Sequence, residues 1–502
     1  MSFANVLVFF DKNLLTFAMG RLVWRDCGIH HALEHRMQKS LLIIATALTT
    51  ASCASIPAFQ PDTLLPPTPE NWSSTADASG EIASQDWVQS LGAPRLATLV
   101  DEALAANPGL AQSLARYDAA RAGARIAGSS RLPSLSLSSG YTRTEPYQGS
   151  GSDSFSLGLS SSWEADLWGR VRDGANAGGL DADAAADDLG AARLSVAGFV
   201  AKGWLGLIEA RQQSELAQRD VQRSRNSLDL TERRFARGLA RSSDVRTARS
   251  ALASSEAALA SRERVETAAA RSLETLLGRY PSGQISRDGD FPEIDQLAGV
   301  GAPSDLLVRR PDVRAAERRL VAAGLRADAA GKALFPSLTL SGGSGSGGVD
   351  VADLFDVDTV ISSLTASIAA PIFAGGRLRA QRDQAEANAR LQVAAYVSTV
   401  LTAWQEAENA IYADDILARR VASLEQAFNE AAEAESLVTR QYSSGVATIF
   451  DLLNAQSRRI SAESQYISAR RDRATNRVDL YLAIAGDFSA APSADPAAQT
   501  GE

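Results

Sequence analysis

The sequence predicts a mixed α and β fold with two tandem structural repeats per chain, on three observations. First, the segment 132–137 recurs as 335–340, and Gly169-Arg170 recurs 207 residues later as Gly376-Arg377. Second, each copy carries a pair of segments in which apolar residues alternate with Ser or Gly. Third, a long helical segment follows each pair. A repeat of this length is too long for a solenoid unit and indicates a duplicated half-protein.

The N-terminal region resembles a signal peptide followed by a lipid-attachment site. Residues 37–39 are a charged start, and an apolar run and small residues then lead to Cys53. Residues 1–36 are interpreted as an upstream extension from a mis-assigned start; a genuine amphipathic extension is the alternative. Thr50-Ala51-Ser52 before Cys53 is a weak version of the bacterial lipoprotein box, which prefers Leu at position 50. We therefore expect residues 1–52 to be removed and Cys53 to be lipidated; cleavage nearby that leaves Cys53 unmodified is the alternative.

Composition excludes several classes of function. All three His residues precede Cys53, so a chain that starts there has no Ser-His-Asp triad and no His-containing zinc site. The formal net charge of −9 argues against a nucleic-acid partner. We expect no enzymatic activity, no catalytic residue, no metal and no cofactor.

The remaining chain divides into five segments. Residues 53–90 are rich in Pro and acids and are expected to form a lipidated, extended tether. The first repeat, 91–280, is expected to hold a helix at 108–131, two strands, a long helix at 170–235 and a helix at 245–277. A Pro- and Gly-rich linker follows at 281–304. The second repeat, 305–487, repeats the pattern with helices at 311–333, 377–441 and 449–483, and 488–502 is a mobile tail.

The strands carry the signature of a transmembrane β-barrel. Leu135, Leu137 and Tyr141 alternate with Ser and Gly, and Phe155, Leu157, Leu159 and Trp163 do the same in the next strand. About ten residues with an apolar face and a small polar face is typical of membrane strands; a soluble sandwich strand has the same period. Residues 143–153 and 342–360 are Gly-rich and polar, and we expect them to form external loops.

Four strands cannot close a barrel, and open strand edges are not tolerated in lipid. Two chains would give eight strands with an interior filled by side chains, and three chains would give twelve strands with a lumen. Small, mixed residues follow the seams of both long helices, which favours close helix packing in a barrel-like layer over a two-stranded coiled coil.

Four segments give the chain a resemblance to a known family. They read WEADLWGR at 163–170, LLVRRPDV at 306–313, FPSLTL at 335–340 and PIFAGGRL at 371–378. In this order they are similar to the TolC-like outer membrane efflux channels, in the lipoprotein branch that serves resistance-nodulation-division pumps. The resemblance implies a homotrimer with a 12-stranded outer membrane β-barrel continuous with a long periplasmic α-helical barrel.

The same resemblance implies a function and partners. The chain would be the outer membrane exit duct of a tripartite efflux pump, passively passing drugs or other small toxic compounds. Its partners would be a periplasmic membrane-fusion adaptor, an inner membrane transporter and outer membrane lipid. The alternatives are a type I protein secretion channel or a structural periplasmic coiled-coil lipoprotein.

Two kinds of site are expected at the ends of the long helices. Two helix-to-helix turns would meet the adaptor, and their residues are Phe235, Gly238, Ser242, Asp244, Tyr442, Gly445, Thr448 and Asp451. A periplasmic gate made by acids would lie nearby, with Glu430, Glu433 and Glu435 as candidates. Gly at a helix end and Asp or Ser before the next helix also serve as ordinary caps, and a solvated helix face is the alternative for the acids.

Overall fold

The computed structural model describes residues 67–74, 87–286, 288–295 and 299–484. They lie within one compact unit, Phe59–Glu502. The expected signal peptide, Cys53 and the expected tail at 488–502 therefore fall outside the described residues.

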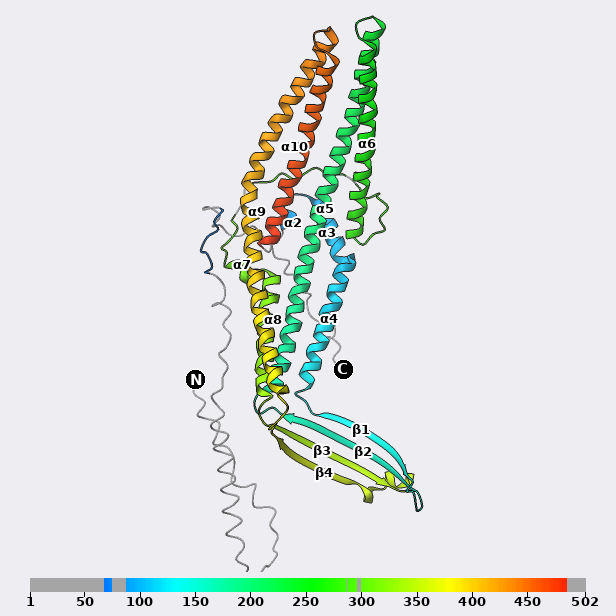
Figure 1. Ribbon diagram of the computed structural model, residues 1–502, viewed down its shortest axis with the longest axis vertical. Coiled ribbons are helices and arrows are strands. Elements are labelled where there is room, and N and C mark those ends of the chain that lie inside the picture. The colour runs from blue at the N-terminus through cyan, green and yellow to red at the C-terminus, as the bar shows by residue number, and fades with distance from the viewer. Residues whose placement is uncertain (1–66, 75–86, 287, 296–298, 485–502) are drawn as a thin grey trace, which may run out of the picture. The chain divides into compact units, whose positions relative to one another are not determined.

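The described chain alternates long helices with pairs of strands (Figure 1). The first part holds α2 (Trp87–Ser90), α3 (Pro94–Ala106), α4 (Pro108–Ser129), β1 (Ser134–Thr144), β2 (Ser152–Ala165), α5 (Arg170–Ala236) and α6 (Ser242–Leu276). The second part holds α7 (Asp305–Arg309), α8 (Pro311–Lys332), β3 (Ser337–Gly348), two short 3-10 helices, Val351–Phe355 and Val357–Thr359, β4 (Ile361–Ala369), α9 (Arg377–Ser444) and α10 (Ile449–Ala483). The order helix, two strands, long helix, helix thus occurs twice.

Polar caps fix where the helices next to the sheet begin. The side chain of Asn107 accepts hydrogen bonds from the amides of Gly109 and Leu110 at 2.8 and 3.1 Å, and so starts α4. The carboxylate of Asp166 accepts from the amides of Val171 and Arg172 at the start of α5. This accounts for the Asp in the 163–170 motif, because a carboxylate also favours the positive end of the helix dipole.

The four strands form one antiparallel sheet in the order β1-β2-β3-β4. The pairing is continuous, with Leu137 opposite Leu159 and Trp163 opposite Leu340. The aromatic rings of Tyr141 and Phe155, which face each other across β1 and β2, lie 5.0 Å apart. Every residue of the two edge strands, β1 and β4, is exposed.

Both expected loops are shorter than predicted. Residues 143–144 belong to β1 and residues 152–153 belong to β2. Residues 342–348 were expected in a loop, but they belong to β3 and pair with β2 as far as Phe155. Glycine makes this pairing possible: a Cβ at Gly345 would lie 2.8 Å from the carbonyl oxygen of Leu157, and one at Gly347 would lie 2.9 Å from that of Phe155. The Gly-rich composition, read as a loop signal, serves close strand contact instead.

The main hydrophobic core, called the central core below, gathers around the middle of α5. Its most buried large side chains include Trp87, Leu96, Leu205, Leu273 and Leu306. Two expectations are corrected here. The end of the expected tether is packed, because Trp72 is 6% exposed and α2 is part of the core. The expected linker 281–304 also contributes buried residues, among them Phe291 and Val300.

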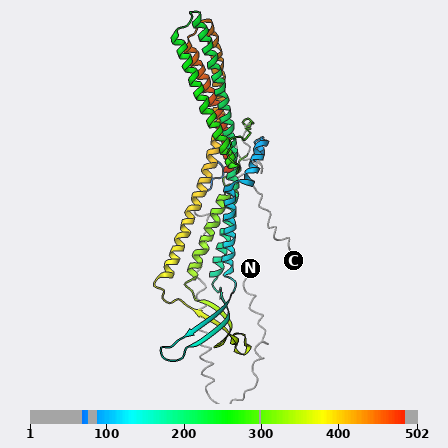
Figure 2. The same ribbon diagram turned by 90° about the vertical axis from the view of Figure 1, so that its right-hand side faces the viewer.

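The sheet and the helix-to-helix turns lie at opposite ends of the long helices (Figures 1 and 2). Between the central core and the sheet, α5 packs against α4 and α8. Between the central core and the turns, α5 pairs with α6 and α9 pairs with α10. Among the described helices, α5 alone is long and apolar enough by composition to cross a membrane, and half of its apolar window is buried within the protein.

Candidate functional site

The turn between α5 and α6 is closed by backbone bonds around a glycine. Gly238 has φ of +74°, a conformation that favours glycine, and its amide donates to the Phe235 carbonyl at 2.9 Å. The next helix begins with the Arg241 amide donating to the Asp244 carboxylate at 2.9 Å. Ser242 is the first residue of α6 and follows the N-cap residue Arg241.

The turn between α9 and α10 has the same construction. Gly445 has φ of +87°, and the following amide, of Val446, donates to the Gln441 carbonyl at 2.9 Å. Thr448 and Asp451 form a reciprocal capping box, in which the Thr448 amide donates to the Asp451 carboxylate at 2.8 Å. Hydrogen bonds from the side chain and the backbone of Thr448 lower the pKa of Asp451 below its ordinary value.

The two expected aromatic residues are not equivalent. Phe235 is 49% exposed at the end of α5, whereas Tyr442 is 3% exposed. The Tyr442 hydroxyl lies 2.9 Å from the Thr231 hydroxyl on α5. Phe235 is therefore available to a partner, while Tyr442 ties the second turn to the first helix pair.

Arg234, which sequence reasoning missed, joins the two turns. Its guanidinium donates to the Tyr442 carbonyl at 2.6 Å and to the Ser443 carbonyl at 3.2 Å, and it lies 5.0 Å from the centre of the Tyr442 ring. It reaches from α5 to the C-terminal end of α9, where the helix dipole and the last helix carbonyls favour a cation. No motif in the sequence marks this residue, because its role depends on contact between distant helices.

Three exposed apolar side chains near the turns were also missed. Leu239 and Val446 directly follow the two turn glycines and are 63% and 78% exposed, and Phe450 is 66% exposed. The signal was present in the sequence, because Leu239 and Val446 are 207 residues apart, the offset of the glycines themselves. Together with Phe235 they give the turns an apolar surface beside polar helix caps.

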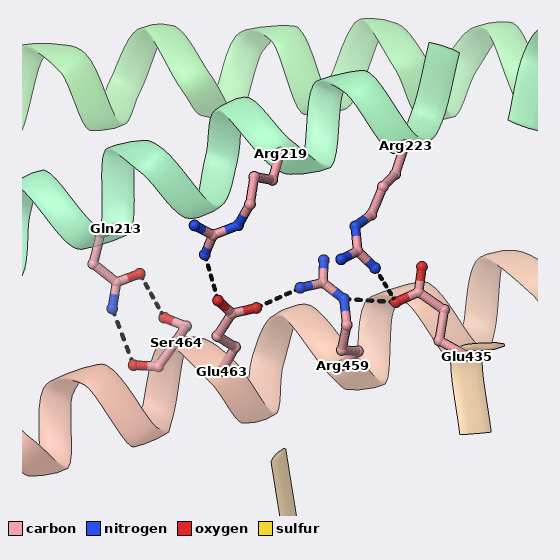
Figure 3. A network of polar contacts seen from close by, with 7 residues as sticks. All are labelled: Gln213, Arg219, Arg223, Glu435, Arg459, Glu463 and Ser464. Carbon is pink, nitrogen blue, oxygen red and sulfur yellow. Dashed lines mark hydrogen bonds and ion pairs between the residues drawn. The ribbon is translucent and has the colours of Figure 1, made fainter. Parts of the chain in front are cut away.

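The structure separates the three expected gate acids. Glu430 and Glu433 are exposed on α9. Glu435 is 5% exposed and sits within a buried ionic network, where its carboxylate lies 2.6 Å from Nε of Arg459 and 2.7 Å from Nη1 of Arg223 (Figure 3). A carboxylate held in this way cannot project into an open passage in this conformation.

The network connects three helices. Arg459 on α10 is 1% exposed and also pairs with Glu463, which in turn pairs with Arg219 on α5. Asp220 lies beside the network; burial raises its pKa, nearby Arg459 opposes this, and Glu435 adds to the increase. The ionic links therefore hold α5, from the first helix pair, to α9 and α10, from the second.

Polar contacts continue along this interface in both directions. Gln213 bonds Ser464 through both ends of its amide, at 3.0 and 2.9 Å, and Gln456 donates to Ser227 at 3.0 Å. From Gln213 to Arg234 the contact between the helix pairs is thus lined by hydrogen-bonding groups, whereas the central core is apolar. Among the described residues, no cluster of His, Cys, Asp and Glu is arranged to hold a metal ion.

A four-stranded sheet with polar and apolar alternation, carried at the end of long paired helices, defines an outer membrane channel subunit. The chain matches the family model described as outer membrane efflux protein over residues 99–279 and 302–486. The chain belongs to this family, which consists of channels, and it functions as an outer membrane efflux duct.

Three relatives illustrate the match. The chain is 32% identical over 465 residues to the pyoverdine export outer membrane protein OpmQ of Pseudomonas aeruginosa, covering 90% of this chain and 97% of the relative. It is 32% identical over 461 residues to the outer membrane protein OprJ of the same species, with coverage of 89% and 95%. The open state of the Neisseria gonorrhoeae MtrE outer membrane channel superposes with a TM-score of 0.76 at 30% identity, covering 86% of this chain and 98% of that chain.

Proposed function

We propose that three copies of the chain form the exit duct of a tripartite efflux pump. The observation that carries this proposal is the sheet, which has most of its apolar residues on one face, mainly Ser, Thr and Gly on the other, and an open edge at β1 and at β4. Residues 341–348 of β3 are Ser or Gly on both faces. Such edges are tolerated in a membrane only when they are paired. Three copies supply twelve strands and a passage, whereas two copies supply eight strands around a filled interior.

Strand direction supports closure between copies. Because all three pairings in the sheet are antiparallel, β1 and β4 run in opposite directions. When β4 of one copy lies beside β1 of the next copy, the antiparallel pattern continues without interruption. The duplicated half-protein explains the even strand number, and the 12-stranded barrel would continue into an α-helical barrel made from α4, α5, α8 and α9 and their extensions.

The two turns are proposed to dock a periplasmic membrane-fusion adaptor that links the duct to an inner membrane transporter. The exposed apolar residues Phe235, Leu239, Val446 and Phe450 supply contact area, and Gly238 and Gly445 let a partner approach the backbone. Asp244 and Asp451 act here as helix caps, so they preserve the shape of the turns.

The gate is proposed to combine two sets of residues. Exposed Glu430 and Glu433 would form rings of negative charge under threefold symmetry. The buried pairs of Glu435 with Arg223 and Arg459 would hold the two helix pairs together in the closed duct.

An outer membrane lipid anchor at Cys53 completes the proposed subunit. The chain would be made with a signal peptide and lipidated after cleavage, so that Cys53→Ser abolishes lipid labelling. Retained labelling in that variant would show that the anchor lies elsewhere.

The proposed cargo is a small toxic compound, since OpmQ is named for pyoverdine export and further relatives are named for toluene and antibiotic efflux. A passive duct leaves the choice of cargo to the transporter. Conductance in planar bilayers tests the duct: purified protein should give discrete channel events. Dye accumulation and protein secretion, measured in a deletion strain, separate an efflux duct from a type I secretion channel.

A further inference from the structure

The connection between β3 and β4 folds back onto the sheet. The Ser346 hydroxyl donates to the Leu354 carbonyl at 2.6 Å, and a Cβ at Gly348 would collide with the Asp353 side chain. The first 3-10 helix, Val351–Phe355, contacts both β2 and β3. Residues 349–360, called the external segment below, therefore cover part of one face of the sheet, at the end away from the helices (Figure 1).

The strand pairing identifies which face is covered. Ser346 lies opposite Leu157 in the pairing of β3 with β2. Gly348 lies opposite Phe155. Residues that pair across two strands point to the same face, and Phe155 and Leu157 belong to the apolar face of β2. Because the apolar face of a membrane barrel meets lipid, the external segment lies on the outside of the proposed barrel and not in its passage.

The strand β3 lacks apolar side chains where the external segment covers it. On the apolar face, β3 carries Leu338 and Leu340 and then four small residues, namely Gly342, Ser344, Ser346 and Gly348. Residues 342–348 extend about 20 Å along the strand at about 3.4 Å per residue, whereas the apolar band of a membrane barrel is about 25 Å tall. The strand alone would therefore present a polar stripe to lipid near the outer rim.

The external segment carries exposed apolar side chains close to this stripe. Val351, Phe355 and Val357 are 54%, 78% and 81% exposed. The first 3-10 helix contacts the two central strands, whereas copies of the chain are proposed to join at the edge strands β1 and β4. This position favours lipid over a second copy as the material that covers the three side chains.

The level of the external segment along the strands matches a membrane surface. It packs beside the position of Phe155, whose ring lies 5.0 Å from that of Tyr141. Aromatic rings are enriched where a membrane meets water. The exposed carboxylates Asp350, Asp356 and Asp358 alternate with the apolar residues of the segment, so the segment has the mixed character of a peptide at that boundary.

We propose that the external segment binds the outer leaflet of the membrane, with Val351, Phe355 and Val357 among the acyl chains. It supplies the apolar surface that the outer part of β3 lacks. Its carboxylates stay in the headgroup layer, because a charged side chain is costly among acyl chains, and they fix how deep the barrel sits. This inference rests on the proposed outer membrane barrel and assigns a lipid-binding role to a connection between strands.

Fluorescence quenching tests the lipid contact in the full-length protein. With Cys27 and Cys53 replaced by Ser, Phe355→Cys carries an environment-sensitive fluorophore in phosphatidylcholine vesicles whose acyl chains bear nitroxides. We expect the lipid nitroxides to lower its emission at least threefold and aqueous iodide to have little effect. Iodide quenching without lipid quenching would place the segment in water, and protection from both quenchers would place it against protein; either result overturns the proposal.

Two neighbouring positions on β4 calibrate the measurement. Leu364 belongs to the apolar face and is 86% exposed, and Thr365 is the next residue and belongs to the opposite face. In the same cysteine-free background, a fluorophore at Leu364→Cys should respond to the lipid nitroxides and one at Thr365→Cys to iodide. If this pair shows no such difference, the barrel itself fails and the inference fails with it. If the pair behaves as expected and position 355 does not, only the inference fails.

A pair of glycine substitutions tests whether packing on β3 brings the segment to the lipid. Gly348→Val places a side chain where Asp353 lies, whereas at Gly342, on the same face, a Cβ would have no neighbour closer than 3.9 Å. With the fluorophore at position 355, Gly348→Val should reduce lipid quenching at least threefold and raise iodide quenching, and Gly342→Val should change neither. Unchanged lipid quenching in the Gly348→Val protein would overturn the proposed arrangement.

Discussion

At the scale of single residues, the two turn glycines form a matched pair for testing partner docking. Both have positive φ, so alanine at either position costs about 1 kcal/mol of backbone strain. Gly445→Trp adds bulk where the adaptor tip is proposed to sit, and it should abolish efflux and crosslinks between the adaptor and Ser443 while trimers still form. Gly445→Ala, which has the strain without the bulk, should retain most of the efflux.

One result would contradict adaptor docking at the two turns. If Gly445→Trp protein folds, still crosslinks to the adaptor and still supports drug resistance, then the turns serve only to connect helices. Gly238→Trp should give the same loss as Gly445→Trp, because the two glycines occupy corresponding turns.

The buried ionic network predicts different outcomes for neighbouring acids. Glu435→Gln removes the carboxylate that faces Arg223 and Arg459, and Arg459 is almost fully buried. Breaking one side of a buried pair costs about 3–5 kcal/mol, so the melting temperature should fall and single-channel conductance should rise. Glu433→Gln, on the exposed face, should leave the melting temperature unchanged. A Glu435→Gln channel with wild-type stability and conductance would remove the network from the gate.

A buried carboxylate beside the central core predicts acid sensitivity. Glu274 is 3% exposed; burial by itself would raise its pKa, but hydrogen bonds from the amides of Gly283, Gln284 and Ile285 and from the Ser282 hydroxyl bring it below the ordinary value of 4.5. Because the folded-state pKa is depressed, this stabilisation is present above pH 4.5 and is lost as pH falls through the folded pKa.

The measurement for Glu274 is the free energy of unfolding as a function of pH. Wild-type stability should drop below pH 4.5 more steeply than that of Glu274→Gln, which is less stable at neutral pH. If the free energy of unfolding falls equally steeply below pH 4.5 in the two proteins, Glu274 is not the source of the acid sensitivity.

Sequence patterns predicted the role of some of these residues and not of others. The turn glycines and their capping acids were predictable, because a helix end and the next helix start are local events with a local chemical signature. Arg234 and Arg459 were not, since each acts through residues that lie far away in the chain. The choice of Glu435 as a gate acid failed to anticipate its burial for the same reason.

At the scale of elements, a row of ion pairs fixes α8 against α5. All acids are on α5 and all bases are on α8; the pairs are Asp173 with Lys332, Asp181 with Arg326, Asp187 with Arg314 and Arg318, and Asp188 with Arg319. Asp187 is 4% exposed and faces two guanidinium groups, at 2.5 and 3.0 Å. The row sets the register between the two halves of the chain on the side nearer the sheet.

This row predicts a large effect at one of two neighbouring aspartates. Asp187→Asn should lower the free energy of unfolding by about 3 kcal/mol, because the buried side of two ion pairs is lost. Asp183→Asn, one turn earlier and exposed, should change it by less than about 0.5 kcal/mol. Equal effects of the two substitutions in thermal unfolding would show that the row does not stabilise the interface.

Helices and strands were more predictable than their connections. The strand pairs follow from alternation with a period of two, and the long helices follow from stripes with three- and four-residue steps. The helix α3 was missed, although Leu96, Leu99, Val100 and Ala103 are spaced for one face and are all buried. The extent of β3 was missed because Gly signals both a loop and close strand contact, and only the partner strand distinguishes them.

At the scale of the whole molecule, the open edges of the sheet predict how many copies assemble. A chain with one cysteine in β1 and one in β4, for example at Ser139 and Thr365, should crosslink to other copies because the two edges pair. Further pairs of positions along both strands would then be scanned. The resulting ladder should reach three copies and stop, since a closed ring of twelve strands leaves no free edge. Chains with only one of the two engineered cysteines should give no ladder.

A ladder that ends at two copies would mean eight strands around a filled interior, and such a barrel could not conduct. A ladder that continues beyond three would mean an open sheet, which lipid does not tolerate.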